Sequence, residues 1–314
     1  MGQPSPIGSI SSLTNKIALI TGASSGLGRA IAEAYAAAGA YVVSADLKPE
    51  PQQQPNIAQI LKDSDLTTPT ADLLNVKWPS EKNGLRRAEY VKCDVTDEES
   101  VKDAVAFTVE KYGRLDIMVN NAGIGAEINK NLNPSGVRRR IHETPLAIFD
   151  ATHAVNARGV WLGCKYALAQ FLSQEPSPEF SRTATGATSD VHRGWIINLG
   201  SILSVSGYPF FSSYCASKGG VLQITRTAAL EYAKDGIHVN AILPGFADTH
   251  ILEGMYANAE GGKESVVNAL SDALPWGRVG RVEDVSRVAV FLAGEGASWV
   301  TGAGVPVDGG WLAR

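Results

Sequence analysis

Short apolar runs alternate with longer stretches of helical periodicity along most of the chain. The apolar runs are nearly continuous and rich in Ile, Val and Leu, which is typical of strands covered on both faces. The predicted strands are Ile17–Thr21, Tyr41–Ala45, Tyr90–Cys93, Ile117–Asn120, Trp195–Leu199 and His238–Leu243. The predicted helices are Arg29–Ala38, Ser100–Tyr112, Ala157–Leu172, Tyr214–Ala233 and Val282–Leu292. This alternation predicts an α/β fold, a doubly wound parallel sheet with helices on both faces.

Three segments interrupt the alternation, and each is rich in polar residues or proline. They are residues 48–88, 126–141 and 173–193. Because each lies between two predicted elements, we expect surface insertions and not separate domains. The chain is therefore predicted to form one domain over residues 15–314, preceded by a flexible lead over residues 1–14. Residues 246–276 contain several glycines and polar residues and are predicted to form a lid over the substrate.

Composition narrows the class of protein. The net charge of −4 and the pI of about 5.8 argue against a nucleic-acid or anionic-membrane partner, since the short run Arg138–Arg140 is the only basic cluster. The chain has no apolar run of the ~18 residues needed to span a membrane and no signal-peptide core, so we expect a cytoplasmic protein. Three widely spaced cysteines predict neither a disulfide framework nor a metal site.

A glycine-rich loop joins the first predicted strand to the first predicted helix. Glycines at such a loop permit unusual φ angles and let the backbone approach a pyrophosphate, which the free N–H groups of the helix start attract. A plain tight turn is the alternative, but the strand before the loop and the helix after it favour a Rossmann-type dinucleotide site. The candidate cofactor residues in the loop are Gly22, Ser24, Ser25, Gly26, Leu27 and Gly28.

An acidic residue, Asp46, ends the next strand 18 residues after Gly28. A carboxylate at this point is expected to bind the adenosine ribose hydroxyls and to repel a 2′-phosphate, so NAD is favoured over NADP. The neutral Ser25 in the loop agrees with this preference, whereas the nearby Lys48 weakens it. The alternative reading of Asp46 is a turn or cap residue.

Tyr214 and Lys218 lie four residues apart at the start of a predicted helix, and therefore on one face. A free tyrosine titrates near pH ~10, too high for a base at neutral pH. A neighbouring ammonium favours the phenolate, so we expect Lys218 to lower the pKa of Tyr214. This pair predicts an acid/base centre.

From Asn15 to Gly310, apart from the three insertions, the sequence resembles the short-chain dehydrogenase/reductase family. The motifs that carry the resemblance share the family's order and spacing along the chain. They are Thr21–Gly28 (TGASSGLG), Cys93–Val95 (CDV), Asn120–Gly123 (NNAG), Asn156, Ser201, Tyr214–Lys218 (YCASK), Pro244–Gly245 with Thr249, Val300–Gly302 (VTG) and Asp308–Gly310 (DGG). One departure is Gly200, where the family usually has a serine before the catalytic one; Ser201 keeps the spacing of 13 residues to Tyr214.

The resemblance implies a role for each matched residue. The implied catalytic set is Asn156, Ser201, Tyr214 and Lys218, with Ser201 hydrogen-bonding the substrate oxygen, Lys218 the nicotinamide ribose, and Asn156 holding a water that links Lys218 to solvent. Asp94 and Val95 would contact the adenine. The further cofactor residues that the resemblance implies are Asn121, Ala122, Gly123, Pro244, Gly245 and Thr249.

The expected activity is reversible hydride transfer between the nicotinamide and a secondary alcohol or ketone, with no metal. Two alternatives remain: non-redox or multi-step chemistry on the same scaffold (an isomerase, dehydratase or cyclase), and a non-catalytic NAD-binding protein. The substrate is predicted to be a small hydrophobic molecule, because apolar residues flank the catalytic ones; these are Ile202, Leu203, Tyr208, Phe210 and Phe211. By resemblance we expect a homotetramer or homodimer, with helices 157–172 and 214–233 between subunits or, alternatively, in the ordinary core.

Overall fold

The computed structural model describes residues 12–51, 67–82, 84–129, 131–176, 192–249, 252, 255–256 and 259–314. Seven strands form one sheet in the order β3-β2-β1-β4-β5-β6-β7, and every neighbouring pair is parallel. The strands are β1 (Ile17–Thr21), β2 (Tyr41–Asp46), β3 (Ala88–Lys92), β4 (Ile117–Asn120), β5 (Gly194–Leu199), β6 (Ile237–Pro244) and β7 (Gly304–Val307). The predicted α/β fold is confirmed. The strand β7 was not predicted.

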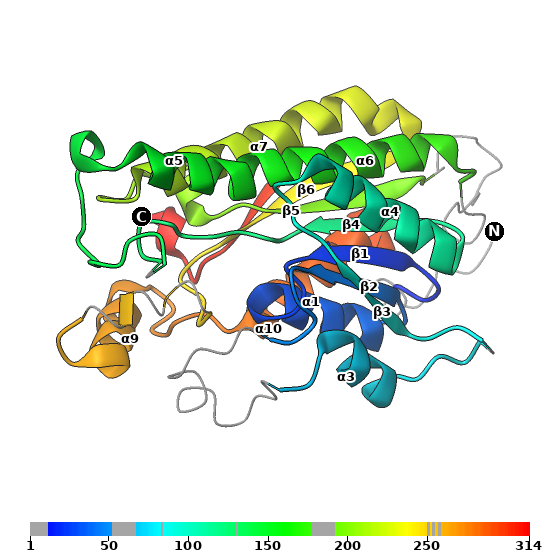
Figure 1. The fold of residues 1–314 in the computed structure, drawn as a ribbon, viewed down its shortest axis with the longest axis horizontal. Helices are drawn as coiled ribbons and strands as arrows, with labels where there is room; N and C mark the ends of the chain where they lie inside the picture. Colours follow the sequence, from blue (N-terminus) through cyan, green and yellow to red (C-terminus); the bar gives the residue numbers. More distant parts are fainter. Residues whose placement is uncertain are drawn as a thin grey trace.

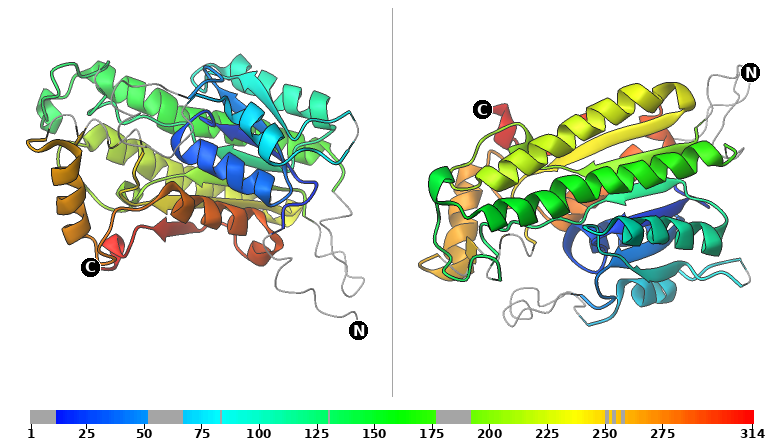
Figure 2. Two further views of the ribbon diagram at one scale, coloured as in Figure 1. Left: turned by 90° about the horizontal axis from the view of Figure 1, so that it is seen from below. Right: turned by 45° about the horizontal axis from the view of Figure 1, so that its top comes forward.

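Helices cover both faces of the sheet (Figures 1 and 2). One face carries α1 (Gly26–Ala37), α3 (Thr70–Lys77) and α10 (Val282–Ala293). The other carries α4 (Glu98–Tyr112), α6 (Gly159–Ser173) and α7 (Ser212–Tyr232). Successive strand residues point to opposite faces, so Ala18 and Ile20 of β1 pack under α1 and α10 while Leu19 packs under α4 and α6. This two-sided burial is why β1, β4 and β5 are nearly continuous apolar runs.

Local capping signals define the ends of α4. Asp97 precedes the helix and its side chain accepts a hydrogen bond from the N–H of Glu99 at 3.1 Å. Glu98 and Glu99 lie in the first turn, where negative charge is favourable, and Gly113 ends the helix in the left-handed conformation. The helix therefore begins two residues before the predicted start at Ser100.

The segments expected to be insertions contain some regular structure. Helix α3 lies within residues 48–88, and a 3-10 turn, η2 (Ile141–Glu143), begins at the last residue of the segment 126–141. Helix α9 (Gly262–Ala273) forms part of the predicted lid, and α5 (Leu146–His153) precedes α6. Most of the segment 173–193, the first eleven residues of the predicted lead, and residues 52–66 lie outside the described residues.

The chain order reverses between β1 and β4, which are neighbours in the sheet although β2 and β3 lie between them in sequence. At such a switch point, the loops after the strands diverge to opposite faces and leave a crevice at the carboxyl ends of the strands. The described part of the chain contains no helix long and apolar enough to cross a membrane. Within the same residues, no cluster of His, Cys, Asp or Glu could hold a metal ion.

Candidate active site

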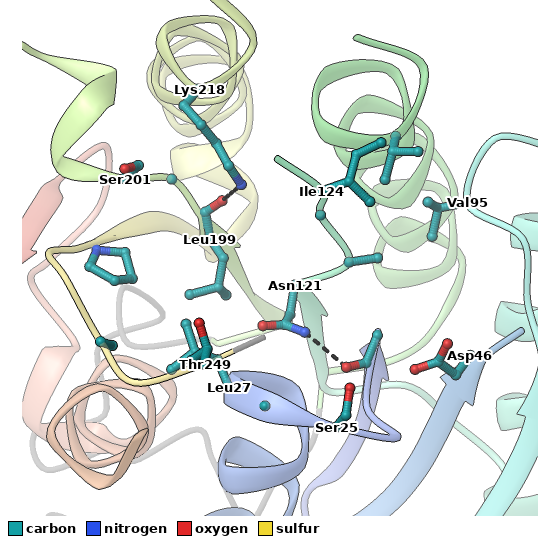
Figure 3. Close-up of a pocket in the computed structure, with 18 of the residues that line it drawn as sticks. Ser25, Leu27, Asp46, Val95, Asn121, Ile124, Leu199, Ser201, Lys218 and Thr249 are labelled. Atoms are coloured by element: carbon teal, nitrogen blue, oxygen red, sulfur yellow. Dashed lines mark hydrogen bonds between the residues drawn. The ribbon is translucent and has the colours of Figure 1, made fainter. Parts of the chain in front are cut away.

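A cavity of about 280 Å³ lies at the carboxyl ends of the central strands. The residues labelled in Figure 3 show that its walls come from the carboxyl ends of β1 to β6, or the loops after them, and from α7. Fifteen of the residues predicted to bind the cofactor line it: Gly22, Ser25, Gly26, Leu27, Asp46, Asp94, Val95, Asn121, Ala122, Gly123, Tyr214, Lys218, Pro244, Gly245 and Thr249. Ser24 and Gly28 are not among its lining residues. The fold therefore brings motifs from the whole length of the chain to one crevice.

The glycine loop is shaped by close backbone packing. Gly22 and Gly26 have φ angles of +65° and +54°, a region that favours glycine. A Cβ atom on Gly28 would lie 2.2 Å from the carbonyl oxygen of Gly22, so α1 can start this close to β1 only with glycine there. Asn121 Nδ2 donates to the carbonyls of Thr21 at 2.9 Å and of Gly22 at 3.1 Å. The loop fits a pyrophosphate, because its bare backbone leads into the N-terminus of α1.

The two loop residues outside the cavity wall support the loop from behind. Ser24 is almost fully buried, and its hydroxyl donates to the carbonyl of Lys48 at 2.6 Å. Gly28 packs against Gly22. In this structure, Ser24 and Gly28 stabilise the shape of the loop.

Asp46 is the last residue of β2, and backbone hydrogen bonds orient its carboxylate. Oδ2 accepts from the N–H of Ser24 at 3.0 Å, and Oδ1 accepts from the N–H of Leu47 at 2.8 Å. Lys218 is the only Lys or Arg among the lining residues of this cavity in the described chain. A dinucleotide bound with its adenosine ribose at this end of the cavity would thus meet the carboxylate of Asp46 and no Lys or Arg among the lining residues.

Asp94 and Val95 follow β3 at the same end of the cavity. Oδ1 of Asp94 accepts hydrogen bonds from the N–H of Thr96 at 2.9 Å and from its hydroxyl at 2.7 Å. Val95 packs closely on α6, because a Cβ on Gly159 would lie 3.0 Å from the Val95 side chain. Both residues are thus fixed in position at the edge of the cavity.

Ser201, Tyr214 and Lys218 meet at the opposite end of the cavity, beyond β5. Tyr214 is in the first turn of α7, 9% exposed, and its hydroxyl has a side-chain hydrogen bond with Ser201. Lys218 follows one turn later, with its Nζ 5.7 Å from the centroid of the Tyr214 ring. The Nζ donates to the carbonyl of Leu199 at 2.7 Å (Figure 3).

Asn156 lies in a π-helical turn, η3 (Ala154–Arg158), between α5 and α6. Its Oδ1 accepts from the N–H of Ile124 at 2.8 Å, and its Nδ2 donates to the carbonyl of Ile124 at 2.9 Å and to Ser217 Oγ at 3.2 Å. An ideal Cβ on Gly123 would lie 3.4 Å from both Asn156 Oδ1 and Lys218 Nζ. The amide of Asn156 and the ammonium of Lys218 thus flank the same glycine. A π-turn often marks such a functional position.

Burial controls the protonation of this group. Burial raises the pKa of Tyr214 to about 12, with a smaller increase from the charge of Glu127 and a decrease from the hydrogen bond with Ser201. Burial lowers the pKa of Lys218 to about 8. The net pKa of Tyr214 is therefore raised, and not lowered as expected from the neighbouring Lys218, because removing the phenol from water outweighs every other influence on it.

A second cavity, of about 70 Å³, adjoins the first at Ser201 and Tyr214. Its walls are mostly apolar and include four of the residues predicted to line a substrate pocket, together with residues of the loops after β4 and β6. They are Gly125, Ile128, Ile202, Leu203, Tyr208, Phe211, Gly245, Phe246, Leu252 and Met255. Trp311, near the C-terminus, packs edge-on against Phe246 at 5.1 Å between ring centroids. Tyr214 and Ser201 therefore lie between the larger cavity and the smaller, mostly apolar one.

The fifth predicted pocket residue, Phe210, points elsewhere. It is 40% exposed, has a φ of +71°, and borders a separate small cavity beside Arg138 and Arg139. A left-handed conformation at a bulky aromatic is strained, and here it directs the neighbouring Phe211 inward.

Sequence reasoning missed several residues of the main cavity. They are Leu47, Cys93, Ile124, Val155, Leu199, Gly200, Ala247 and Leu252. A usable signal existed for some of them: Cys93 and Leu199 end predicted strands, and Leu47 and Gly200 come directly after strand ends. No local pattern pointed to Val155 or Leu252, which come from a helical turn and from the segment after β6.

Two family models match the chain. The model described as short chain dehydrogenase matches residues 16–77, and the model described as Enoyl-(Acyl carrier protein) reductase matches residues 75–312. A 2-(R)-hydroxypropyl-CoM dehydrogenase from Xanthobacter autotrophicus is 33% identical, covering 95% of this chain and 99% of the relative. A cis-4-hydroxycyclohexanecarboxylate dehydrogenase from Sinomonas cyclohexanicum is also 33% identical, covering 95% and 97%.

A solved structure from Beutenbergia cavernae, assigned as an NAD(P)-dependent gluconate 5-dehydrogenase and holding NADP at low occupancy, superposes with a TM-score of 0.73. It is 29% identical in sequence and covers 97% of this chain and all of its own. The similarity thus spans both the cofactor cavity and the residues around Tyr214.

Proposed function

This chain belongs to the short-chain dehydrogenase/reductase family, and we propose that it moves a hydride reversibly between NAD(H) and a secondary alcohol or ketone, with Tyr214 as the acid and base. It is an oxidoreductase acting on hydroxyl or ketone groups. The observation that carries the proposal is the position of Tyr214 and Ser201, which line both the cofactor cavity and the apolar one. A substrate carbon in the apolar cavity would face the nicotinamide across these two side chains.

The nicotinamide supplies or accepts the hydride when the cofactor is bound. In ketone reduction, Tyr214 gives its phenolic proton to the substrate oxygen, and its high pKa means that the proton is present at neutral pH. Ser201 hydrogen-bonds the same oxygen and stabilises its developing charge. In alcohol oxidation the phenol must first lose its proton, which an ammonium on Lys218 favours.

Lys218 and Asn156 are proposed to maintain the proton supply. The ammonium of Lys218 is buried against the carbonyl of Leu199 and is within reach of the nicotinamide ribose end of the cavity. Asn156 is fixed by Ile124 and Ser217, so its amide has a defined orientation beside Lys218. A water held there would link Lys218 to solvent.

NAD is proposed as the cofactor, with NADP less favoured. The carboxylate of Asp46 at the ribose end would repel a 2′-phosphate, and no basic side chain lines that end in the described chain. The similar structure from Beutenbergia cavernae holds NADP, which is the alternative cofactor. An NAD preference favours alcohol oxidation in a cell, because NAD is usually kept mostly oxidised.

The substrate is proposed to be a small, largely hydrophobic secondary alcohol or ketone. Support comes from the walls of the smaller cavity, where Ile202, Leu203 and Phe211 are each at most 8% exposed. The two dehydrogenases named above differ in substrate, so they support the chemical class of the reaction and not a particular molecule.

A homotetramer or homodimer is proposed, with α6 and α7 between subunits. These two helices lie side by side on the outer surface (Figure 2). Their outward faces carry large apolar side chains, with Trp161 51% exposed and Leu230 84% exposed. Light scattering on the purified protein tests this proposal, and a monomer at micromolar concentration contradicts it.

Tyr214→Phe tests the acid/base role. We expect it to reduce turnover by about 10²–10⁴-fold while NADH binding, followed by fluorescence, changes little. Activity is measured at 340 nm with a panel of cyclic and acyclic secondary alcohols and ketones. The matched control is Tyr232→Phe in the last turn of the same helix, which should keep full activity. Undiminished turnover by Tyr214→Phe refutes the role.

A further inference from the structure

The segment after the NNAG motif, expected to be an insertion with no assigned role, brings a buried carboxylate to the catalytic tyrosine. Glu127 is only 9% exposed, and its Oε1 accepts a hydrogen bond from the backbone N–H of Tyr214 at 2.9 Å. The backbone of Glu127 is fixed in turn, since its carbonyl accepts from Asn133 Nδ2 at 2.7 Å. Two positions 87 residues apart in sequence are thus joined directly.

Glu127 replaces a missing helix cap. Helix α7 begins after Phe211, which provides no side-chain hydrogen bond, and its first turn contains no acidic residue. The first N–H groups of a helix need acceptors from outside the helix, and negative charge is favourable there. Glu127 supplies both from another segment, and the N–H group that it binds is that of Tyr214 itself.

The second carboxylate oxygen of Glu127, Oε2, is buried without a hydrogen bond to any of the described residues. Such a group is costly to bury, so its retention needs a reason beyond packing. The charge of Glu127 acts on the side chain of Tyr214 and raises its pKa, so its influence reaches the phenol as well as the backbone.

We propose that Glu127 is a positioning residue for proton transfer: its buried carboxylate holds the first turn of α7 and places a negative charge beside Tyr214. This inference rests on the proposed role of Tyr214. The charged and titratable groups that face Glu127 are Tyr214 and Cys215 on α7, and Arg138 and Arg139, which line the small cavity beside it. Arg139 is already engaged, since its guanidinium donates to Asn133 Oδ1 at 2.6 Å.

Two substitutions separate the two effects. Glu127→Gln keeps an acceptor for the N–H of Tyr214 but removes the charge, so the limb of the pH–rate profile governed by Tyr214 should move to lower pH by about half to one unit. Glu127→Ala removes the acceptor as well and should lower kcat by roughly tenfold, with KM for NADH unchanged.

The control is Glu143→Gln, which removes a charge at an exposed position two residues beyond the segment 126–141. The profiles are recorded with NADH and cyclohexanone, or with whichever ketone of the panel is reduced, and NADH binding is measured alongside. A shift in Glu127→Gln that is absent from Glu143→Gln supports the proposal. Equal profiles in the wild type and Glu127→Gln overturn it, as does an equal shift in the control.

Failure of this inference can be distinguished from failure of the proposed function. If Tyr214→Phe stays active, the acid/base role itself fails, whatever Glu127 does. If Tyr214→Phe is inactive and Glu127→Gln behaves as the wild type, only the role of Glu127 fails. Since glutamine has the size and shape of glutamate, the test holds even if Glu127→Ala does not fold.

Discussion

A buried histidine at the start of β6 should make the fold sensitive to mild acid. His238 is 8% exposed and its ring stacks on that of Trp195. Nε2 of His238 lies 2.9 Å from Nδ1 of His192. Its Nδ1 is 3.3 Å from the carbonyl oxygen of Val300. Since a carbonyl can only accept, we infer that Nδ1 carries the proton and that Nε2 accepts from His192. The neutral ring therefore uses both nitrogens, and a second proton would disrupt the arrangement.

The size of this loss of stability follows from the pKa of His238. Burial, followed by the charges of His192 and Lys16, lowers the pKa of His238 from 6.5 to about 4. The unfolded chain therefore binds this proton more readily than the folded one. The contribution to stability is complete above about pH 6.5 and is lost as the pH falls towards 4. Between pH 7.5 and 4.5 this amounts to about 2.5 kcal/mol of unfolding free energy.

Urea unfolding at pH 7.5 and 4.5 measures this loss. Other groups contribute too, and burial raises the pKa of Asp116, which acts in the opposite direction. We therefore compare the loss of unfolding free energy between pH 7.5 and 4.5 in the wild type with the loss in His238→Asn, whose side-chain amide can still donate to the carbonyl of Val300. We expect the wild type to lose about 2.5 kcal/mol more than the variant.

The control for this comparison is His142→Asn, because the His142 side chain is 67% exposed. Between pH 7.5 and 4.5, this variant should lose as much unfolding free energy as the wild type. If His238→Asn also loses as much as the wild type, the burial argument is refuted.

The remaining predictions concern cofactor choice and the core. Asp46→Ala should weaken NADH binding by roughly 10–100-fold and NADPH binding far less, measured by fluorescence titration; an equal loss means that the ribose contact has been misassigned. Gly163→Ala would place a Cβ 1.8 Å from Asn120 Oδ1, next to the hydrogen bond between Asn120 and Asn198, so urea unfolding should show a loss of about 2–4 kcal/mol. Gly220→Ala, whose Cβ meets nothing closer than 3.9 Å, should be neutral or stabilising by up to ~1 kcal/mol.

The sheet could be predicted from the sequence because its signal is local. A strand buried on both faces must be apolar at every position, and β1 and β5 show this pattern clearly. Strand β7 escaped prediction because its residues are only partly buried and include Gly304 and Pro306, so no apolar run marks it. Helix α3 escaped for a similar reason, since few of its residues face the core and its surroundings are polar.

The cofactor residues were also accessible to sequence reasoning, although their roles stay predictions. Gly22 directly follows β1, Gly26 lies in the same loop, and Asp46 ends β2; parallel strands bring all their carboxyl ends to one edge. The spacing of Tyr214 and Lys218 similarly fixed them on one face of a helix. These conclusions depend on neighbours in the chain and on the order of elements, which the sequence contains.

What the sequence determined by itself was therefore the alternation of elements, the glycine-rich loop between β1 and α1, and the identity of the groups at the strand ends. Only the tertiary structure decided how those groups behave. Burial set the pKa of Tyr214 in the direction opposite to the prediction, and the contact from Glu127 to its backbone joins distant segments. The physical reason is that desolvation and long-range contacts depend on what surrounds a group in three dimensions, which no local spacing encodes.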